Sequence, residues 1–192
     1  MPSALRRLPI QHRVNLFRIA RLPLFVLLTC WSAVALGQDQ TANFTGTWKL
    51  DRSLSEPMRD MLKAQGYNAV EVSILEKVPV TQIMNQTRDG LTIEIRATVV
   101  KTSELLRFDG QQYADRNNVV GPLVRKSQWS ADGRQLQTTT RYNAKSGLGV
   151  EMVVTRTISP NERNWLFQDT KLRLADGREF KARQVFVRQD KG

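Results

Sequence analysis

The sequence has a single cysteine, Cys30, and a single histidine, His12, among its 192 residues. Both lie in the first 37 residues, so the remainder of the chain forms no disulfide and has no imidazole. This excludes Cys–His and Ser-His-Asp nucleophilic sites, the H-E-x-x-H zinc site and histidine-rich metal sites from residues 38–192. The glycine-rich phosphate loops G-x-x-x-x-G-K-[ST] and G-x-G-x-x-G are also absent. We therefore expect no catalytic residue, no metal site and no cofactor.

Acidic residues are missing from residues 1–37, which carry five arginines. An apolar run over residues 22–36 follows the basic stretch, and Ala35-Leu36-Gly37 places small residues at −3 and −1 of a cleavage site. This pattern is typical of a secretory signal peptide. The apolar run is shorter than a membrane-spanning helix, which needs about 20 residues. We predict a signal peptide over 1–37, an exported domain over 38–192 that is periplasmic or extracellular, and no stable membrane span after cleavage. An uncleaved anchor is the alternative.

The positive charge is smaller than it first looks. The formal charge of +11 falls to +6 without the predicted signal, because 24 Lys and Arg then face 18 Asp and Glu. No clustered basic run is present, so we expect no nucleic-acid partner. The basic residues alternate with polar neighbours, which predicts a solvated outer face. Those assigned to it are Arg88, Arg96, Arg107, Arg125, Lys126, Arg134 and Arg141.

Short segments with period-two alternation, separated by Asp-Gly turns, fill the chain from Val80 onward. Asp-Gly favours tight hairpins because it supplies positive φ angles. The absence of βαβ spacing indicates an antiparallel meander, and closure into a barrel removes its exposed edges. We predict an all-β fold, a ten-stranded antiparallel up-and-down β-barrel. The expected strands are 45–51, 81–87, 91–99, 102–108, 111–115, 122–129, 134–142, 150–159, 165–174 and 179–188.

A short helical segment interrupts the strands after the first of them. Apolar residues that include Met58 and Leu62 share one face of a helix predicted over residues 53–65, with Ser55 as its N-terminal cap. Residues 67–78 fit either a second short helix or a loop. We expect this segment to cover one end of the barrel. The apolar stripe then either gates a portal or simply packs over the barrel mouth.

The opening of the domain, Phe44-Thr45-Gly46-Thr47-Trp48-Lys49-Leu50, resembles that of the calycins. The lipocalins have a G-x-W motif there, and the fatty-acid- and retinoid-binding proteins begin with F-x-G-x-W-K. The strand order, the lid position and the final strand 181–186 are similar to the second group. The resemblance covers residues 43–188 and implies a lipocalin-like barrel with a small hydrophobic or amphipathic ligand inside. Two departures are the signal peptide and Gln184-Val185-Phe186, where fatty-acid carriers have an Arg-x-Tyr clamp.

The same resemblance implies a structural role for the first strand. In that group the tryptophan of the motif plugs the closed end of the barrel, and an arginine from a late strand packs on it. We therefore expect Gly46 and Trp48 to close the barrel. Either Arg183 or Arg188 can provide the cation, and we assign the role to Arg183.

Two polar side chains fall on otherwise apolar strand faces. Arg156 shares a face with Val154 and Ile158, and Gln184 shares one with Phe186. A charge that faces an interior is costly unless it is paired, and a guanidinium fork suits a carboxylate. The alternatives are an Arg156 that reaches water or an internal acid, and a Gln184 amide that is satisfied inside the core. The predicted ligand-binding set is Arg156, Gln184, Phe186, Met58, Leu62 and Tyr142.

Three functions remain compatible with these residues. The first is an exported binding protein whose Arg156 and Gln184 hold the polar head of the ligand, which carries a carboxylate in one version. The second is an envelope structural or interaction protein whose barrel is filled by side chains. The third is an enzyme that uses a carboxylate such as Glu94 or Glu151. No paired catalytic constellation is evident, so we predict a binding protein that is not an enzyme.

Overall fold

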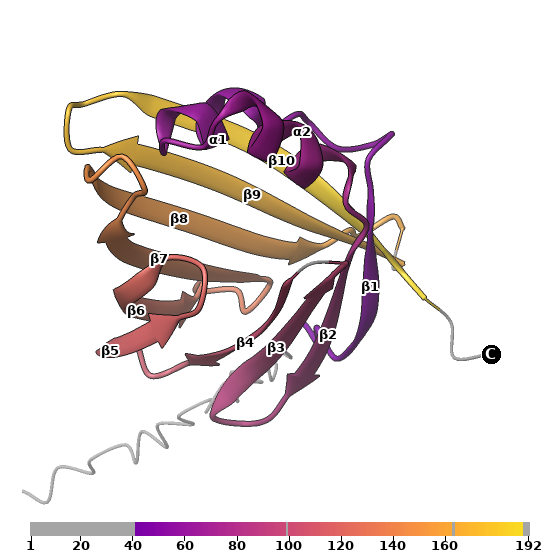
Figure 1. The fold of residues 1–192 in the computed structure, drawn as a ribbon. Coiled ribbons are helices and arrows are strands. Elements are labelled where there is room, and N and C mark those ends of the chain that lie inside the picture. The colour runs from indigo at the N-terminus through magenta and orange to yellow at the C-terminus, as the bar shows by residue number, and fades with distance from the viewer. Residues whose placement is uncertain (1–40, 99, 163, 190–192) are drawn as a thin grey trace, which may run out of the picture. The chain divides into compact units, whose positions relative to one another are not determined.

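The computed structural model describes residues 41–98, 100–162 and 164–189, so the predicted signal peptide lies outside the described residues. Within them, ten strands form one sheet in the order β4-β3-β2-β1-β10-β9-β8-β7-β6-β5, and every neighbouring pair is antiparallel. The sheet curls into a nearly closed barrel (Figure 1). The predicted fold class is therefore confirmed. The strands are β1 (Gly46–Asp51), β2 (Val80–Gln86), β3 (Gly90–Ala97), β4 (Val100–Arg107), β5 (Gln112–Asn117), β6 (Gly121–Trp129), β7 (Gln135–Asn143), β8 (Gly149–Ile158), β9 (Trp165–Leu174) and β10 (Glu179–Arg188).

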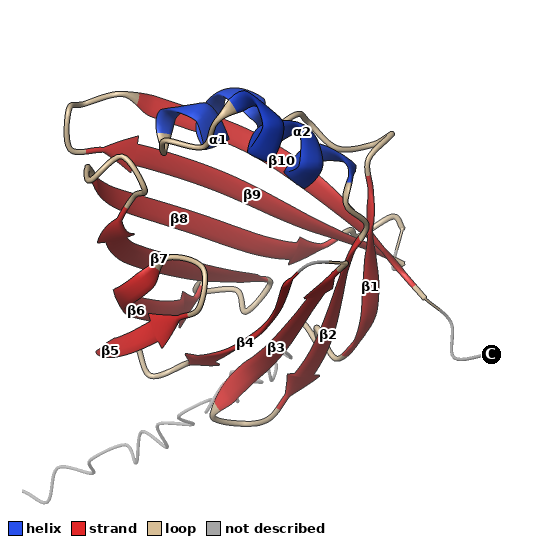
Figure 2. Ribbon diagram, viewed as in Figure 1, coloured by secondary structure: helices blue, strands red, loops and turns tan. Residues whose placement is uncertain are grey.

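Two short helices, α1 (Arg59–Ala64) and α2 (Ala69–Lys77), follow β1 and lie together at one end of the barrel (Figure 2). The segment that was ambiguous in sequence forms α2, because Asn68 and Glu71 make a reciprocal capping box at its start. We call α1, α2 and the segment that leads into them, residues 52–78, the lid.

The first helix begins later than predicted, and Ser55 is not its cap. The Ser55 hydroxyl accepts the Val185 N–H of β10 at 2.9 Å. Next to it, the Glu56 N–H donates to the Arg183 carbonyl at 2.8 Å, and the Arg183 N–H donates to the Glu56 carboxylate at 2.7 Å. These bonds hold residues 55–56 against β10, and the helix starts only at Arg59.

The apolar core is divided into two clusters. One surrounds Trp48 at the end of the barrel away from the lid, and the other lies where Met61 of α1 meets the strand ends. Between them, many of the inward-facing residues in the middle of the strands are polar. The interior therefore has an apolar floor, a polar middle and an apolar roof. The first cluster consists of Phe44, Trp48, Met84, Leu91, Ile93, Leu106, Leu136, Leu166 and Phe186, and the second of Met61, Leu123, Tyr142, Ala144, Val150, Leu172, Leu174 and Ala182.

The barrel wall has a seam between β4 and β5, which are the two outer strands of the sheet and are not paired with each other. Side chains bridge this seam. The Asn117 amide of β5 donates to the Thr102 hydroxyl of β4 at 3.3 Å. Arg125 of β6 reaches past β5 to Glu104 of β4, with 2.9 Å between Nη2 and Oε2. The seam therefore brings charged side chains into the interior.

Candidate functional site

A cavity of about 370 Å³ lies inside the barrel, between the two apolar clusters. This volume is at the lower end of the about 300–1,000 Å³ that is usual for small-molecule sites. Its apolar wall is formed by Met58, Leu75, Val78, Val80, Ile95, Ala97, Val100, Val119, Val120, Leu123, Met152 and Val154. Its polar wall is formed by Gln82, Thr102, Glu104, Asn117, Arg125, Thr138, Thr140, Tyr142, Arg156, Gln168 and Thr170.

Arg156 points into this cavity from β8 and is 4% exposed. Period-two alternation places it inside, as its neighbours predict. Its hydrogen bonds are long: Nη2 to Glu104 Oε1 is 3.4 Å and Nη1 to Thr138 Oγ1 is 3.5 Å, while Nε has no partner. Burial lowers the pKa of Arg156, and the Glu104 carboxylate opposes that shift. Because an arginine stays protonated in proteins, the cavity contains an under-paired positive charge.

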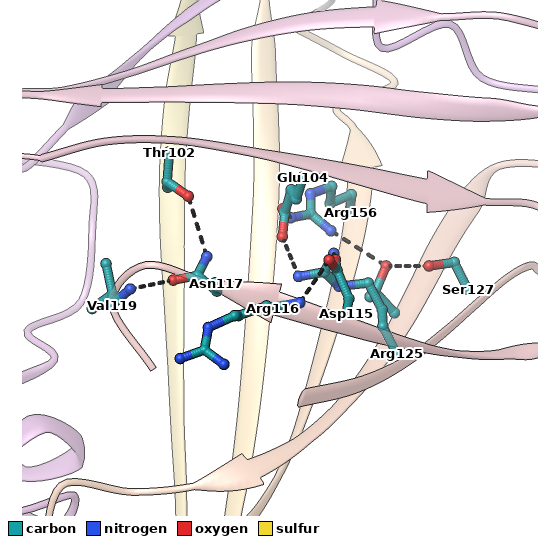
Figure 3. Close-up of polar contacts among 10 residues, drawn as sticks. Thr102, Glu104, Asp115, Arg116, Asn117, Val119, Arg125, Ser127 and Arg156 are labelled. Carbon is teal, nitrogen blue, oxygen red and sulfur yellow. Dashed lines mark hydrogen bonds and ion pairs between the residues drawn. The ribbon is translucent and has the colours of Figure 1, made fainter. Parts of the chain in front are cut away.

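Arg125 is the second buried arginine, and the prediction that it lies on the outer face was wrong. It is 6% exposed and binds two carboxylates, Glu104 Oε2 and Asp115 Oδ2, each at 2.9 Å (Figure 3). The two faces of β6 are both mixed in polarity, so alternation alone did not choose between them. The burial of Leu123 and Ser127 shows that the odd positions face inward.

Glu104 joins the two arginines and was not singled out in the sequence. It comes from β4, where it shares the inward face with Thr102 and the fully buried Leu106. Its two oxygens face different arginines: Oε2 faces Arg125 and Oε1 faces Arg156 (Figure 3). The predicted strand 102–108 overlaps β4 but begins two residues late and ends one residue late, and the burial of Leu106 marks the even positions as interior.

Gln184, Met58 and Leu62 line a groove of about 360 Å³ beneath the lid. Met58 also lines the interior cavity, so it lies where groove and cavity meet. Gln184 is half-buried and faces the groove, while Gln82 and Gln168 are the glutamines that line the cavity. The Gln82 amide nitrogen donates to Gln168 Oε1 at 3.3 Å, and Gln82 Oε1 has no partner.

The other two predicted ligand residues lie in different surroundings. Tyr142 lines the cavity, and its hydroxyl donates to Gln65 Oε1 at 2.6 Å, which connects β7 to the lid. Burial raises the pKa of Tyr142, so the hydroxyl stays protonated and can donate. Phe186 is 1% exposed in the floor cluster and lines neither cavity nor groove. The prediction that Phe186 contacts the ligand is therefore wrong. Its ring is buried among the apolar residues of the floor cluster and has a packing role.

The closed end of the barrel is built around Trp48, which is fully buried. Its indole Nε1 donates to the Phe44 carbonyl at 2.8 Å, and the Arg188 guanidinium lies 4.4 Å from its ring centre. Gly46 has φ +146°, and a Cβ there would lie 3.1 Å from Arg188 Nη1. Arg183 instead packs on Phe167 and pairs with Asp169, with 2.7 Å between Nε and Oδ1. The assignment of the closing role to Arg183 was therefore wrong, and Arg188 has that position.

No family model and no curated protein matches the chain. Solved structures do match over most of it. The REP1-NXSQ fatty acid transporter is 17% identical, with a TM-score of 0.58 over 77% of this chain and 97% of its own. The apo lipid binding protein 8 of Caenorhabditis elegans is 13% identical, with a TM-score of 0.61 over 78% and 99%. Human cRBP IV is 16% identical, with a TM-score of 0.57 over 77% and 99%.

The chain has the fold of the fatty-acid- and retinoid-binding calycin-type barrels. At these identities the likeness is one of fold alone. It confirms the fold that the opening motif implied, including the ten strands and the helices after the first of them. It leaves the ligand to be argued from the side chains of this barrel.

The two carboxylates considered for catalysis lie on the outer face of the barrel. Glu94 pairs with Arg96 and Lys101 at 2.9 Å each, and these cations hold its pKa at about 2. Glu151 pairs with Arg141 at 2.7 Å. Neither lines the interior cavity. Within the described ranges there is no cluster of acidic, His or Cys residues able to hold a metal ion, and no helix has the length and apolar character to cross a membrane.

We expect the two candidate arginines to differ in their effect on stability. Arg188→Ala removes the cation over Trp48 and a 3.1 Å bond to the Thr45 carbonyl, and should lower the free energy of unfolding by about 1–2 kcal/mol. Arg183→Ala removes a solvent-exposed ion pair and should lower it by less than about 1 kcal/mol. Urea denaturation of both variants measures the difference. A larger loss for Arg183→Ala would contradict the assignment of the closing role to Arg188.

Proposed function

We propose that this barrel binds a small hydrophobic or amphipathic ligand, and that Arg156 holds an acidic head group of that ligand. One observation carries the proposal: Arg156, a buried arginine whose Nε has no partner and whose other hydrogen bonds are 3.4 and 3.5 Å long, lines an interior cavity of about 370 Å³. An unsatisfied buried donor costs free energy. A ligand carboxylate at Arg156 would remove that cost through charge-assisted hydrogen bonds.

The distribution of polarity in the cavity supports one orientation of the ligand. Thr138, Arg156 and Gln168 lie toward the middle of the barrel, whereas Met58, Leu75 and Val78 come from the lid. A ligand with its head toward Arg156 and its apolar part toward the lid matches both ends. A cavity of this size also argues against a barrel filled by its own side chains. The fold neighbours named as a fatty acid transporter and a lipid binding protein support a hydrophobic ligand and a binding role in place of catalysis.

Ligand binding can be tested on the purified domain, residues 38–192. Organic extraction followed by mass spectrometry identifies any lipid that co-purifies, and a fluorescent fatty-acid probe reports occupancy. We expect the probe to bind with one molecule per chain and decanoate to displace it. The absence of both a co-purified lipid and probe binding would contradict the proposal.

A pair of variants on β8 locates the site. Val154 lines the cavity, while Val153 alternates to the other face of the same strand. Val154→Phe fills part of the cavity and should weaken probe binding by about tenfold or more, whereas Val153→Phe should leave it within about threefold. Equal effects of the two variants would place the probe outside the barrel.

We also propose that the chain is exported, with cleavage after Gly37. The basic stretch, the apolar run and the small residues before Gln38 support this proposal. N-terminal sequencing of the protein recovered from its native location should begin at Gln38. A product that retains residues 1–37 would instead favour the uncleaved anchor.

A further inference from the structure

We propose that Glu104 makes the cavity selective for a ligand head that carries one negative charge, over a neutral head and over a head with two negative charges. The inference rests on the proposed function, because it concerns the head group held by Arg156. Its basis is the arrangement of three charged side chains in the cavity wall: Glu104, Arg125 and Arg156.

Arg125 is already neutralised by its neighbours. It binds Glu104 and Asp115 at 2.9 Å each, and these bonds use both terminal nitrogens. Asp115 stands at the rim of the seam with its side chain 44% exposed, while that of Arg125 is 7% exposed. Its Nε has no partner either, but each of its terminal nitrogens is 2.9 Å from a carboxylate, so Arg125 attracts an additional anion less strongly than Arg156 does.

Arg156 shares the carboxylate of Glu104 with Arg125. Glu104 reaches it at 3.4 Å, but the other oxygen of Glu104 is held by Arg125 at 2.9 Å. Glu104 cannot turn fully toward Arg156 without weakening that shorter bond. Glu104, Arg125 and Arg156 together carry one net positive charge, and since the half-exposed Asp115 lies against Arg125, the under-paired cation is Arg156.

The number of charges on the ligand head then decides its binding. One negative charge pairs with Arg156 and brings the charge summed over Glu104, Arg125, Arg156 and the ligand head to zero. A neutral head leaves the guanidinium uncompensated. A second negative charge must lie close to Glu104, whose carboxylate is 3.4 Å from the same guanidinium, and like charges repel strongly in a poorly hydrated site.

Ligands with one chain and different heads test this without altering the protein. We suggest decanol, decyl sulfate and decyl phosphate, each used as a competitor of the fluorescent fatty-acid probe. The sulfate carries one charge throughout, whereas the phosphate gains its second charge near about pH 6. We expect decyl phosphate to weaken at least about tenfold between about pH 5 and about pH 8, while decyl sulfate changes less than about threefold.

The sulfate also controls for titration of the protein itself. The charged groups of the cavity wall are Glu104, Arg125 and Arg156, with Asp115 behind Arg125, and Tyr142 is the further titratable group that lines it. Any change in these groups affects both ligands alike. A fall in decyl phosphate binding alone therefore reports the second charge of the phosphate.

Substitution of Glu104 should abolish the discrimination between one and two negative charges. Glu104→Gln keeps an oxygen acceptor and removes the charge, so decyl phosphate should tighten at least about tenfold at about pH 8 and lose its pH dependence. Asp115→Asn should have a smaller effect, because Asp115 is half exposed and touches Arg125 only on the rim side. Glu94→Gln on the outer face of β3 is the matched control and should leave all three ligands within about threefold of the unaltered protein.

The outcomes separate the two proposals. If none of the decyl compounds displaces the probe, the proposed function fails. If decyl phosphate and decyl sulfate bind equally at both pH values, the cavity does not discriminate between one and two negative charges. This inference is then overturned, while the binding function stands. Should Glu104→Gln fail to fold, the pH comparison on the unaltered protein still decides the matter.

Discussion

Replacing Arg156 by methionine is expected to weaken decanoate binding by about tenfold to a hundredfold and to leave decanol binding within about threefold. Hydrogen bonds to a charged group are worth about 1.5–3 kcal/mol, which corresponds to this range. The guanidinium is buried, its Nε has no partner and its other two hydrogen bonds are long, so a ligand carboxylate can form stronger bonds to it. Competition against the fluorescent probe measures both ligands.

The Arg156→Met variant should remain folded. Methionine keeps most of the side-chain volume, and Glu104 retains its 2.9 Å pair with Arg125. Arg141→Met on the outer face of β7 is a suitable control, since Arg141 is exposed and pairs with the surface residue Glu151. If decanoate and decanol weaken equally in Arg156→Met, Arg156 does not hold the acid head.

Replacing Trp48 by alanine is expected to lower the free energy of unfolding by about 3–5 kcal/mol. The side chain is fully buried in the floor cluster, and its loss leaves a cavity beside Phe44 and Phe186. It also removes the indole bond to the Phe44 carbonyl and leaves Arg188 without its aromatic partner. Urea denaturation, analysed as a two-state transition, measures the change.

A second tryptophan provides the comparison. Trp165 begins β9 on the outer face, where it meets Phe167 edge to face and is only partly buried. Trp165→Ala should cost less than half of what Trp48→Ala costs. At temperatures where Trp48→Ala stays folded, its affinity for the probe should match that of the unaltered protein. A stable Trp48→Ala variant that has lost probe binding would show that Trp48 contacts the ligand.

Local patterns predicted which residues lie inside the barrel at most positions. Arg156 and Gln184 were placed on inward faces because alternation along a strand depends only on its immediate neighbours. The same logic located the ten strands, since each hairpin is bounded by its own turn residues. It did not decide β6, where apolar and polar residues occur on both faces, and Arg125 was therefore placed on the wrong side.

Contacts between distant segments were decided only in three dimensions. The register of β1 against β10 sets Trp48 opposite Arg188, which is why that arginine covers the indole while Arg183 lies further along the strand on the outer face. The Ser55 hydroxyl likewise accepts a hydrogen bond from Val185 of β10, 130 residues away in sequence, and so does not cap the helix.

The sequence by itself determined the ten strands, the lid after the first of them and the inward direction of Arg156. The tertiary structure decided what Arg156 meets there. Its partner Glu104 is 52 residues away, and the two approach only because the sheet curls until β4 lies across the interior from β8. Alternation is a property of a single strand, whereas a charge network across a barrel depends on the register and closure of the whole sheet.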